Sequence, residues 1–277
     1  MAPKRRRADE LLLEKLNLES IELARALILE GRALSDDHPI SSAAALLKVD
    51  AVLRVKGELD AYVSRGAHKL KRALAVFQQD LSGKICVDVG ASTGGFTDVM
   101  LRAGAQRVYA VDVGYNLLDY KLRSNPRVVP LERVNARFLT REILPEAPAF
   151  GATDVSFISL KAILPAILPL MAEHARFVAL IKPQFEAPKE LVGARGVVRD
   201  PAVHKMVVSD IVSWLAQTGW SAVGLDFSPI TGAEGNIEFL LLMAPAEDSA
   251  GCVEDSTMNA TIRAAYDKFF KSVDLGL

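Results

Sequence analysis

Apolar residues recur at helical spacing near the start of the chain. Two short helices joined near residues 17–19 would bury them together, and Gly31 provides a helix stop. Residues 40–57 then have the pattern of short strands or turns. We therefore predict a small α+β domain over residues 1–60. The apolar positions of its helices are Leu11, Leu12, Leu13, Leu16, Ile21, Leu23, Ala24, Ala26, Leu27 and Ile28.

From Lys84 onward, strand-like apolar runs alternate with helical segments. Seven strands and at least four helices in alternation predict a doubly wound α/β domain with a mostly parallel sheet over residues 61–246. A polar, acidic tail is expected over residues 247–277. The expected strands span residues 85–89, 107–113, 128–134, 153–158, 176–181, 221–227 and 237–243, and the expected helices 96–102, 117–123, 160–173 and 202–218.

Charge is distributed unevenly along the chain. Lys and Arg number 33 and Asp and Glu 34, and the resulting net charge of −1 argues against a uniformly basic nucleic-acid-binding surface. The last 45 residues, however, carry 3 basic and 8 acidic residues. The first 232 residues therefore have a net charge of +4, which permits a polyanionic partner.

Cysteine content and hydropathy bear on the class of protein. Only two cysteines occur, Cys86 in an apolar run and Cys252 in a polar segment, which does not suggest a disulfide framework or a metal cluster. The most apolar stretch, residues 162–172, contains two prolines and is shorter than the roughly 18 residues of a membrane-spanning helix. We expect a cytoplasmic protein with no bound metal and no membrane partner.

The first strand-to-helix turn of the α/β domain, residues 88–97, is rich in glycine. Parallel sheets bind ligands at such turns. Gly90 allows a sharp exit from the strand, and Gly94 and Gly95 let the backbone pass close to a ligand. The spacing differs from the dinucleotide motif, which disfavours a dehydrogenase. Asp112 follows 22 residues after Gly90, where a carboxylate can accept hydrogen bonds from ribose hydroxyls. The pattern predicts a nucleoside-containing ligand.

Four charged residues fall in or beside apolar segments: Lys69, Asp154, Lys182 and Glu238. Burying one charge alone is costly, so such residues are seldom left unpaired. Lys182 follows a strand-like run and precedes Pro183, which would end the strand and direct the ammonium toward the ligand edge. The alternative is an ordinary strand-end lysine in solvent.

Two sets of motifs resemble known families. Residues 11–12, 24–34 and 52–55 resemble the αL RNA-binding motif, although Ser35-Asp36-Asp37-His38 places two carboxylates in a turn that is usually neutral. The α/β domain resembles the TlyA family of rRNA ribose methyltransferases, historically labelled haemolysins, in which an αL motif precedes an FtsJ-like catalytic domain. The motifs of this second resemblance are residues 62–70, 154–160, 181–186, 196–200, 228–232 and 235–238.

The resemblance implies a class I, Rossmann-like methyltransferase that uses S-adenosylmethionine. The expected reaction is methyl transfer to a ribose 2′-hydroxyl, of a cytidine, in ribosomal RNA or ribosomal subunits, by a protein that is monomeric when free. Cofactor binding is expected of Asp88, Gly90, Ser92, Gly94, Gly95, Phe96, Asp112 and Asn135. RNA binding is expected of Arg5, Arg6, Arg25, Arg32, Arg65, Lys189, Arg195 and Arg199, and of other basic residues in segment 4–7.

The FtsJ-like Lys-Asp-Lys-Glu tetrad matches Lys69, Asp154, Lys182 and Glu238. A ribose hydroxyl is a poor nucleophile, so transfer needs a base beside it and in-line geometry. A free lysine has a pKa of roughly 10.4 and must be tuned to serve as that base. We expect Lys182 to be the base or the group that orients the hydroxyl, with the two carboxylates as orienters and Lys69 as a positioning cation.

Several alternatives remain open at this stage. Asn135 would contact adenine or only cap a loop. Residues 184–201 would close over RNA, and Phe185 would stack on a flipped base or only pack beside the strand. The competing functions are a non-catalytic RNA-binding protein and a membrane-active haemolysin, the latter suggested by the family label alone.

Overall fold

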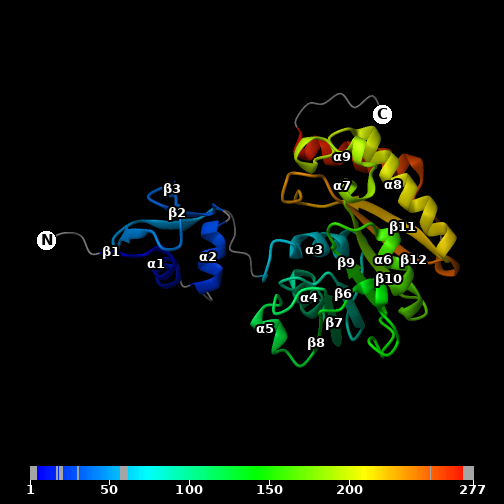
Figure 1. Ribbon diagram of the computed structural model, residues 1–277, viewed down its shortest axis with the longest axis horizontal. Helices are drawn as coiled ribbons and strands as arrows, with labels where there is room; N and C mark the ends of the chain where they lie inside the picture. The colour runs from blue at the N-terminus through cyan, green and yellow to red at the C-terminus, as the bar shows by residue number, and fades with distance from the viewer. Residues whose placement is uncertain are drawn as a thin grey trace. The chain divides into compact units, whose positions relative to one another are not determined.

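The computed structural model describes residues 5–16, 18, 21–29, 31–56, 62–249 and 251–270. Residues 4, 17 and 19, which belong to the predicted basic segment and helix junction, lie outside this part. Contacts divide the chain into two compact units, Met1–Ala61 and Tyr62–Leu277. The first unit has one hydrophobic core cluster and the second has two. Figure 1 shows the elements of both units.

The first unit is a small α+β fold. Its two helices pack their apolar faces against short strands, with Leu11, Leu12 and Leu27 fully buried. The hairpin between β2 and β3 turns through Asp36 and Asp37, whose φ angles of 47° and 66° suit the turns that join antiparallel strands. The elements are β1 (Arg5–Arg7), α1 (Ala8–Lys15), α2 (Ile21–Leu29), β2 (Ala33–Ser35), β3 (His38–Pro39), β4 (Leu46–Lys48) and β5 (Leu53–Val55).

The second unit contains a seven-stranded sheet of order β11-β12-β10-β9-β6-β7-β8. The five strands from β6 to β10 are mutually parallel, and β12 runs antiparallel to both of its neighbours. The predicted mostly parallel α/β sheet is therefore confirmed. The strands are β6 (Ile85–Val89), β7 (Arg107–Asp112), β8 (Val128–Glu132), β9 (Phe150–Thr153), β10 (Arg176–Ile181), β11 (Trp220–Phe227) and β12 (Phe239–Pro245).

Helices cover both faces of this sheet (Figure 1). Strand β10 shows why: Phe177, Ala179 and Ile181 face one core, whereas Val178 and Leu180 face the other. A strand buried on both faces is apolar throughout, as residues 176–181 are after their first position. The helices are α3 (Ala67–Val76), α4 (Gly95–Arg102), α5 (Tyr120–Arg123), α6 (Leu160–Ile167), α7 (Pro183–Glu186), α8 (Pro201–Leu215) and α9 (Asp255–Phe269).

Two regions differ from the sequence prediction. The fourth strand was expected over 153–158 but spans Phe150–Thr153, because beyond Thr153 the chain no longer pairs with β10 and turns toward the ligand edge. Helix α9 lies within the expected polar tail 247–277 and was not predicted. It buries Met258, Ile262 and Tyr266 against the main core, so this segment is part of the second unit.

The strand order creates the place for a ligand. From β6 the chain moves to β7 and β8 on one side, then returns to β9 and β10 on the other side. Loops that leave neighbouring strands in opposite directions open a crevice at the carboxyl ends of those strands. In this protein the crevice lies where β6 meets β9.

Candidate active site

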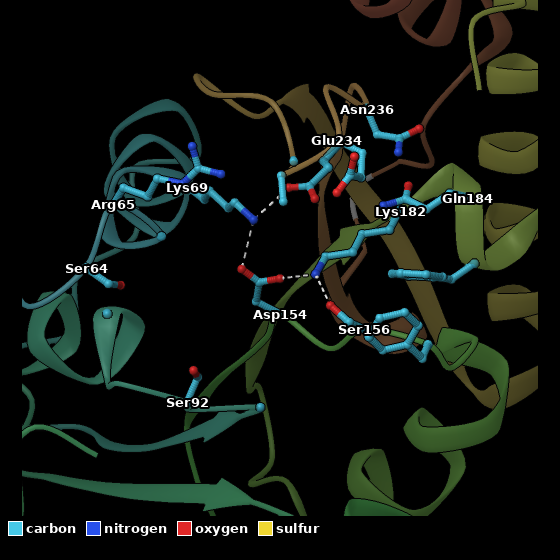
Figure 2. Close-up of a pocket in the computed structure, with 18 of the residues that line it drawn as sticks. Ser64, Arg65, Lys69, Ser92, Asp154, Ser156, Lys182, Gln184, Glu234 and Asn236 are labelled. Atoms are coloured by element: carbon cyan, nitrogen blue, oxygen red, sulfur yellow. Dashed lines mark hydrogen bonds and ion pairs between the residues drawn. The ribbon is translucent and has the colours of Figure 1, made fainter. Parts of the chain in front are cut away.

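A pocket of about 700 Å³ occupies this crevice (Figure 2). Its walls are the loop after β6, the loop after β9, helix α7 and residues 232–238, and the first turn of α3 closes another side. All four predicted tetrad residues line it. Residues distant in the sequence are thus brought together as predicted.

The three glycines of the loop after β6 are needed for different steric reasons. Gly90 has φ +83°, and a Cβ there would lie 2.9 Å from the Asp154 carbonyl oxygen. A Cβ on Gly95 would lie 2.3 Å from Ser64 Oγ. Gly94 does not line the pocket; its φ of +98° begins α4, and Leu118 and Leu122 occupy the space beside it. Gly90 and Gly95, with Ser92 and Phe96, therefore form the wall that faces the pocket.

Asp112 ends β7 and holds two loops together. Its Oδ2 accepts a hydrogen bond from Ser92 N at 2.8 Å, and its Oδ1 accepts one from Gly114 N at 2.7 Å. Each carboxylate oxygen can accept a further hydrogen bond. Asp112 does not line the pocket; it shapes the glycine loop, and ribose binding by its remaining acceptor capacity stays a prediction.

Asp88 lies behind the loop and does not line the pocket. It is 1% exposed, and its Oδ2 accepts hydrogen bonds from both the backbone N and the hydroxyl of Thr97. Burial raises the pKa of Asp88 to about 7; the Thr97 hydrogen bonds oppose this rise, and the charges of Asp154 and Asp112 add to it. Its position supports the loop from beneath.

Asn135 is placed as a cap. Its side-chain oxygen accepts a hydrogen bond from Arg137 N at 3.1 Å at the start of a 3-10 turn, and it does not line the pocket. Contact with a cofactor therefore stays a prediction for Asn135.

The four tetrad residues form a continuous chain of ion pairs, and Figure 2 labels Lys69, Asp154 and Lys182. Lys69 Nζ lies 2.7 Å from Glu238 Oε2 and 3.0 Å from Asp154 Oδ2. Lys182 Nζ lies 2.6 Å from Asp154 Oδ1. Asp154 thus bridges the two lysines, one through each oxygen.

Local structure explains how these side chains meet. Lys69 lies in the first turn of α3, and Lys182 follows β10 directly, ahead of Pro183. Asp154 follows β9, and Glu238 precedes β12. Because β12 is antiparallel, its amino-terminal end lies at the same sheet edge as the carboxyl ends of β9 and β10.

The electrostatics of the cluster are asymmetric. Burial alone would lower the pKa of Lys69, but the carboxylates of Asp154 and Glu238 outweigh it and raise that pKa above its ordinary value. Burial opposes ionisation of Asp154 as well, and the two lysines hold its pKa below the usual range. Lys69, with two carboxylates, is the more firmly held cation, as expected for a positioning charge.

Several pocket residues were missed from the sequence. Ser156 accepts a hydrogen bond from Lys182 Nζ at 3.0 Å. Phe157 has φ +64°, is 89% exposed and packs at 5.0 Å between ring centroids against Phe185, the aromatic residue singled out from the sequence. Asn236 is buried and bonds to the backbone of residues 196 and 198. The i, i+2 spacing of Asp154 and Ser156 could have indicated that both side chains reach the pocket. No sequence pattern indicated the positive φ of Phe157.

The predicted RNA-binding residues of the second unit fall into two groups. Arg65 and Arg195 line the pocket. A second cavity of about 610 Å³ shares Arg195 with the pocket and includes Arg199. Lys189 is exposed on a 3-10 turn and lines neither cavity.

In the first unit, the predicted RNA-binding arginines contact other protein groups. Arg6 pairs with Glu14, and Arg25 Nε lies 3.0 Å from the buried Oδ2 of Asp9. Arg32 donates to the Lys56 carbonyl at 3.1 Å. Arg5 lies on β1 and is exposed. RNA binding by these residues stays a prediction.

The described residues contain neither a candidate metal-binding cluster nor a candidate membrane-spanning helix. No group of three or more His, Cys, Asp or Glu side chains there is arranged to hold a metal ion. No helix in the same part of the chain is both long and apolar enough to cross a membrane.

Most of the chain is similar to known proteins. A family model described as FtsJ-like methyltransferase matches residues 62–244. The Bacillus subtilis protein YqxC is 46% identical over 91% of this chain and 90% of its own. The 16S/23S rRNA (cytidine-2′-O)-methyltransferase TlyA of Mycobacterium tuberculosis is 41% identical, over 93% of this chain and 97% of its own. A solved Streptococcus thermophilus structure described as a hemolysin is 39% identical, with a TM-score of 0.78 and 98% of each chain covered.

Proposed function

The chain belongs to the FtsJ-like methyltransferase family, and we propose that it methylates the ribose 2′-hydroxyl of a cytidine in ribosomal RNA. The predicted resemblance to this family is confirmed. The observation that carries the proposal is the Lys69–Glu238, Lys69–Asp154 and Lys182–Asp154 ion pairs beside the glycine loop. A substrate hydroxyl that enters this pocket meets a buried lysine.

The methyl donor of this enzyme is S-adenosylmethionine. The pocket fits such a group, because Gly90 and Gly95 line it without a side chain and Asp112 keeps acceptor capacity at the end of β7. When bound, the sulfonium supplies an electrophilic methyl carbon. We propose that Gly90, Ser92, Gly95 and Phe96 surround its methionine part and that Asp112 holds its ribose. Asp88 and Gly94 act on the loop itself.

In the proposed reaction Lys182 acts as a neutral amine, whose lone pair accepts the proton of the ribose hydroxyl. The new bond between the 2′-oxygen and the methyl carbon forms as the carbon–sulfur bond breaks, so the proton on the oxygen must leave. Asp154 orients Lys182 through Oδ1 and Lys69 through Oδ2. Glu238 is the second carboxylate that pairs with Lys69. In the proposed mechanism Lys69 therefore stays a fixed cation, and it positions Asp154.

RNA contacts are proposed for the basic residues around the pocket. Arg65 and Arg195 flank the tetrad, and Arg199 lies in the adjoining cavity. The structure gives the Arg195 and Arg199 guanidinium groups no hydrogen bond or ion pair with any residue it describes. Two unpaired arginines along adjoining cavities suit the phosphates on either side of a target nucleotide. Lys189, on the preceding turn, would extend this contact.

The proposed layout assigns RNA capture to the first unit and chemistry to the second. Residues 1–60 would be the αL RNA-binding domain, with Arg5, Arg6, Arg25 and Arg32 toward phosphates. The division of the chain after residue 61 supports this assignment. All tetrad residues come from one chain, which suits a monomer, and a ribosomal substrate would place the protein in the cytoplasm.

Lys182→Ala tests the proposed chemistry. We expect loss of methyl transfer to ribosomal RNA by at least a hundredfold, in the range of general-base contributions, with calorimetric binding of S-adenosylmethionine retained. Lys205→Ala is the matched control, since Lys205 pairs with Asp255 on the surface. Activity of Lys182→Ala near that of the control would remove Lys182 from the mechanism. Absence of cofactor binding by the wild type would favour an RNA-binding protein without catalysis.

A further inference from the structure

Ser156 lies two residues after Asp154, on the segment that follows β9. The Asp154 backbone N still donates to the Val89 carbonyl at 3.1 Å, so the chain stays close to β6 for one residue after β9. Successive side chains of an extended chain point to opposite sides. Val155 packs against the main core, whereas Asp154 and Ser156 both line the pocket. The two polar residues therefore reach Lys182 from the same side.

The Lys182 amino group has two protein partners. Nζ lies 2.6 Å from Asp154 Oδ1 and donates to Ser156 Oγ at 3.0 Å (Figure 2). A tetrahedral nitrogen has three positions besides its bond to Cε. Among the described residues no third partner is present for Nζ, and Lys182 itself lines the pocket. The ion pair with Asp154 and the hydrogen bond to Ser156 together hold Nζ at the wall of the pocket.

The two lysines of the tetrad are held differently. Lys69 lies between two carboxylates, which favour its charged form. Lys182 shares one carboxylate and receives a neutral hydroxyl as its second partner. A hydroxyl orients an amine without adding a second negative charge that would hold the proton. This difference suits a group that must accept a proton.

We propose that Ser156 is a positioning residue that, with Asp154, directs the remaining position of Lys182 Nζ at the ribose 2′-hydroxyl. The inference rests on the proposed function. Ser156 acts through Lys182 and does not itself react. Its effect is on the chemical step, because a misdirected base lowers the rate of proton transfer with the substrate still bound.

The loop that carries Ser156 is fixed independently of Lys182. Ser159 caps α6, with its Oγ accepting from Lys161 N at 3.1 Å. Glu186 on α7 accepts from Ser159 Oγ at 2.6 Å and from Leu160 N at 2.8 Å. The loop after β9 is thereby tied to the helix after β10. Ser156 is held before any substrate arrives, as a positioning role requires.

An isosteric pair of variants tests the hydroxyl. Ser156 is exposed, so a branched side chain has room there. Ser156→Thr keeps the hydroxyl, and Ser156→Val has the same shape without it. We expect kcat of Ser156→Val to fall about tenfold, the lower end for a hydrogen bond to a charged group. Ser156→Thr should stay within about threefold of the wild type, and KM for RNA and cofactor affinity should be unchanged in both.

A lower kcat for Ser156→Val, with Ser156→Thr near the wild type, would support the role of the hydroxyl. Equal kcat values for Val, Thr and wild type would overturn the role of Ser156. Equal losses in Val and Thr would also overturn it, since shape and not the hydroxyl would then matter, and so would a change in KM alone. Thermal melting of each variant verifies folding, and Ser156→Ala repeats the test with a smaller side chain. A wild type that is folded and binds cofactor but does not methylate RNA would count against the proposed function instead.

Discussion

Ionisation of the buried Asp88 should lower the stability of the second unit as pH rises. Burial raises its pKa from 3.8 to about 7, despite the hydrogen bonds from Thr97. Between these two values the folded protein keeps the proton and the unfolded chain has lost it. The folded state is therefore favoured below pH 4, and this advantage is lost as pH rises through 7. The full difference corresponds to about 4 kcal/mol, of which about 3 kcal/mol falls between pH 5 and 8.

Asp88→Asn removes this titration and keeps the acceptor for Thr97. Both tryptophans, Trp214 and Trp220, lie in the second unit, so their fluorescence during urea unfolding reports on its stability. The free energy of unfolding of the wild type, relative to that of the variant, should fall by about 3 kcal/mol from pH 5 to pH 8. Because the other titrating groups are the same in both proteins, their contributions cancel in the difference between the two unfolding free energies.

Asp80→Asn provides the control. Hydrogen bonds from Ser82 keep the pKa of Asp80 below its ordinary value, so this group stays ionised from pH 5 to 8 in both states. Its stability curve should run parallel to that of the wild type. Parallel curves for Asp88→Asn as well would refute the reasoning, since burial would then not have raised the Asp88 pKa.

Two further substitutions test the frame of the site. Gly90→Ala places a Cβ 2.9 Å from the Asp154 carbonyl oxygen at φ +83°, so we expect a loss of at least about 1–2 kcal/mol in stability and weaker cofactor binding by calorimetry. Gly83→Ala has a similar φ with open space around it and should bind cofactor normally; equal binding by both variants would contradict this role of Gly90. Asn236→Ala removes hydrogen bonds to Val198 N and the Gly196 carbonyl, both 2.9 Å long. We expect a loss of about 1–3 kcal/mol and faster proteolysis of residues 193–200, and an unchanged cleavage rate there would argue against this clamp.

The sheet and the tetrad could be predicted because their signals are local. Residues 85–89 and 176–181 are apolar runs bounded by polar or turn residues, and the structure places strands over the same residues. Lys182 followed such a run and preceded a proline, which located it at a strand end. The grouping of the four charges was implied by the resemblance to the FtsJ-like tetrad, and the cost of burying a charge alone is consistent with it.

Other features depend on contacts that sequence patterns do not encode. Ser156 meets Lys182 from the segment after β9, and that strand ends at Thr153, five residues before the end that its apolar pattern indicated. Asp88 and Asn135 have the residue types of ligand-binding positions, but their side chains serve Thr97 and a 3-10 turn. Helix α9 was hidden by polar composition, although Met258, Ile262 and Tyr266 have helical spacing.

The strand order has a consequence for the synthesis of the protein. Strand β12 lies between β10 and β11, and β11 has no other partner in the sheet. The last two strands must therefore enter as a hairpin, after every parallel strand has left the ribosome. Glu238 directly precedes β12 and joins the sheet with this hairpin. Before that step, Asp154 is the one tetrad carboxylate that can pair with Lys69. A growing chain therefore cannot assemble the tetrad before its sheet is complete.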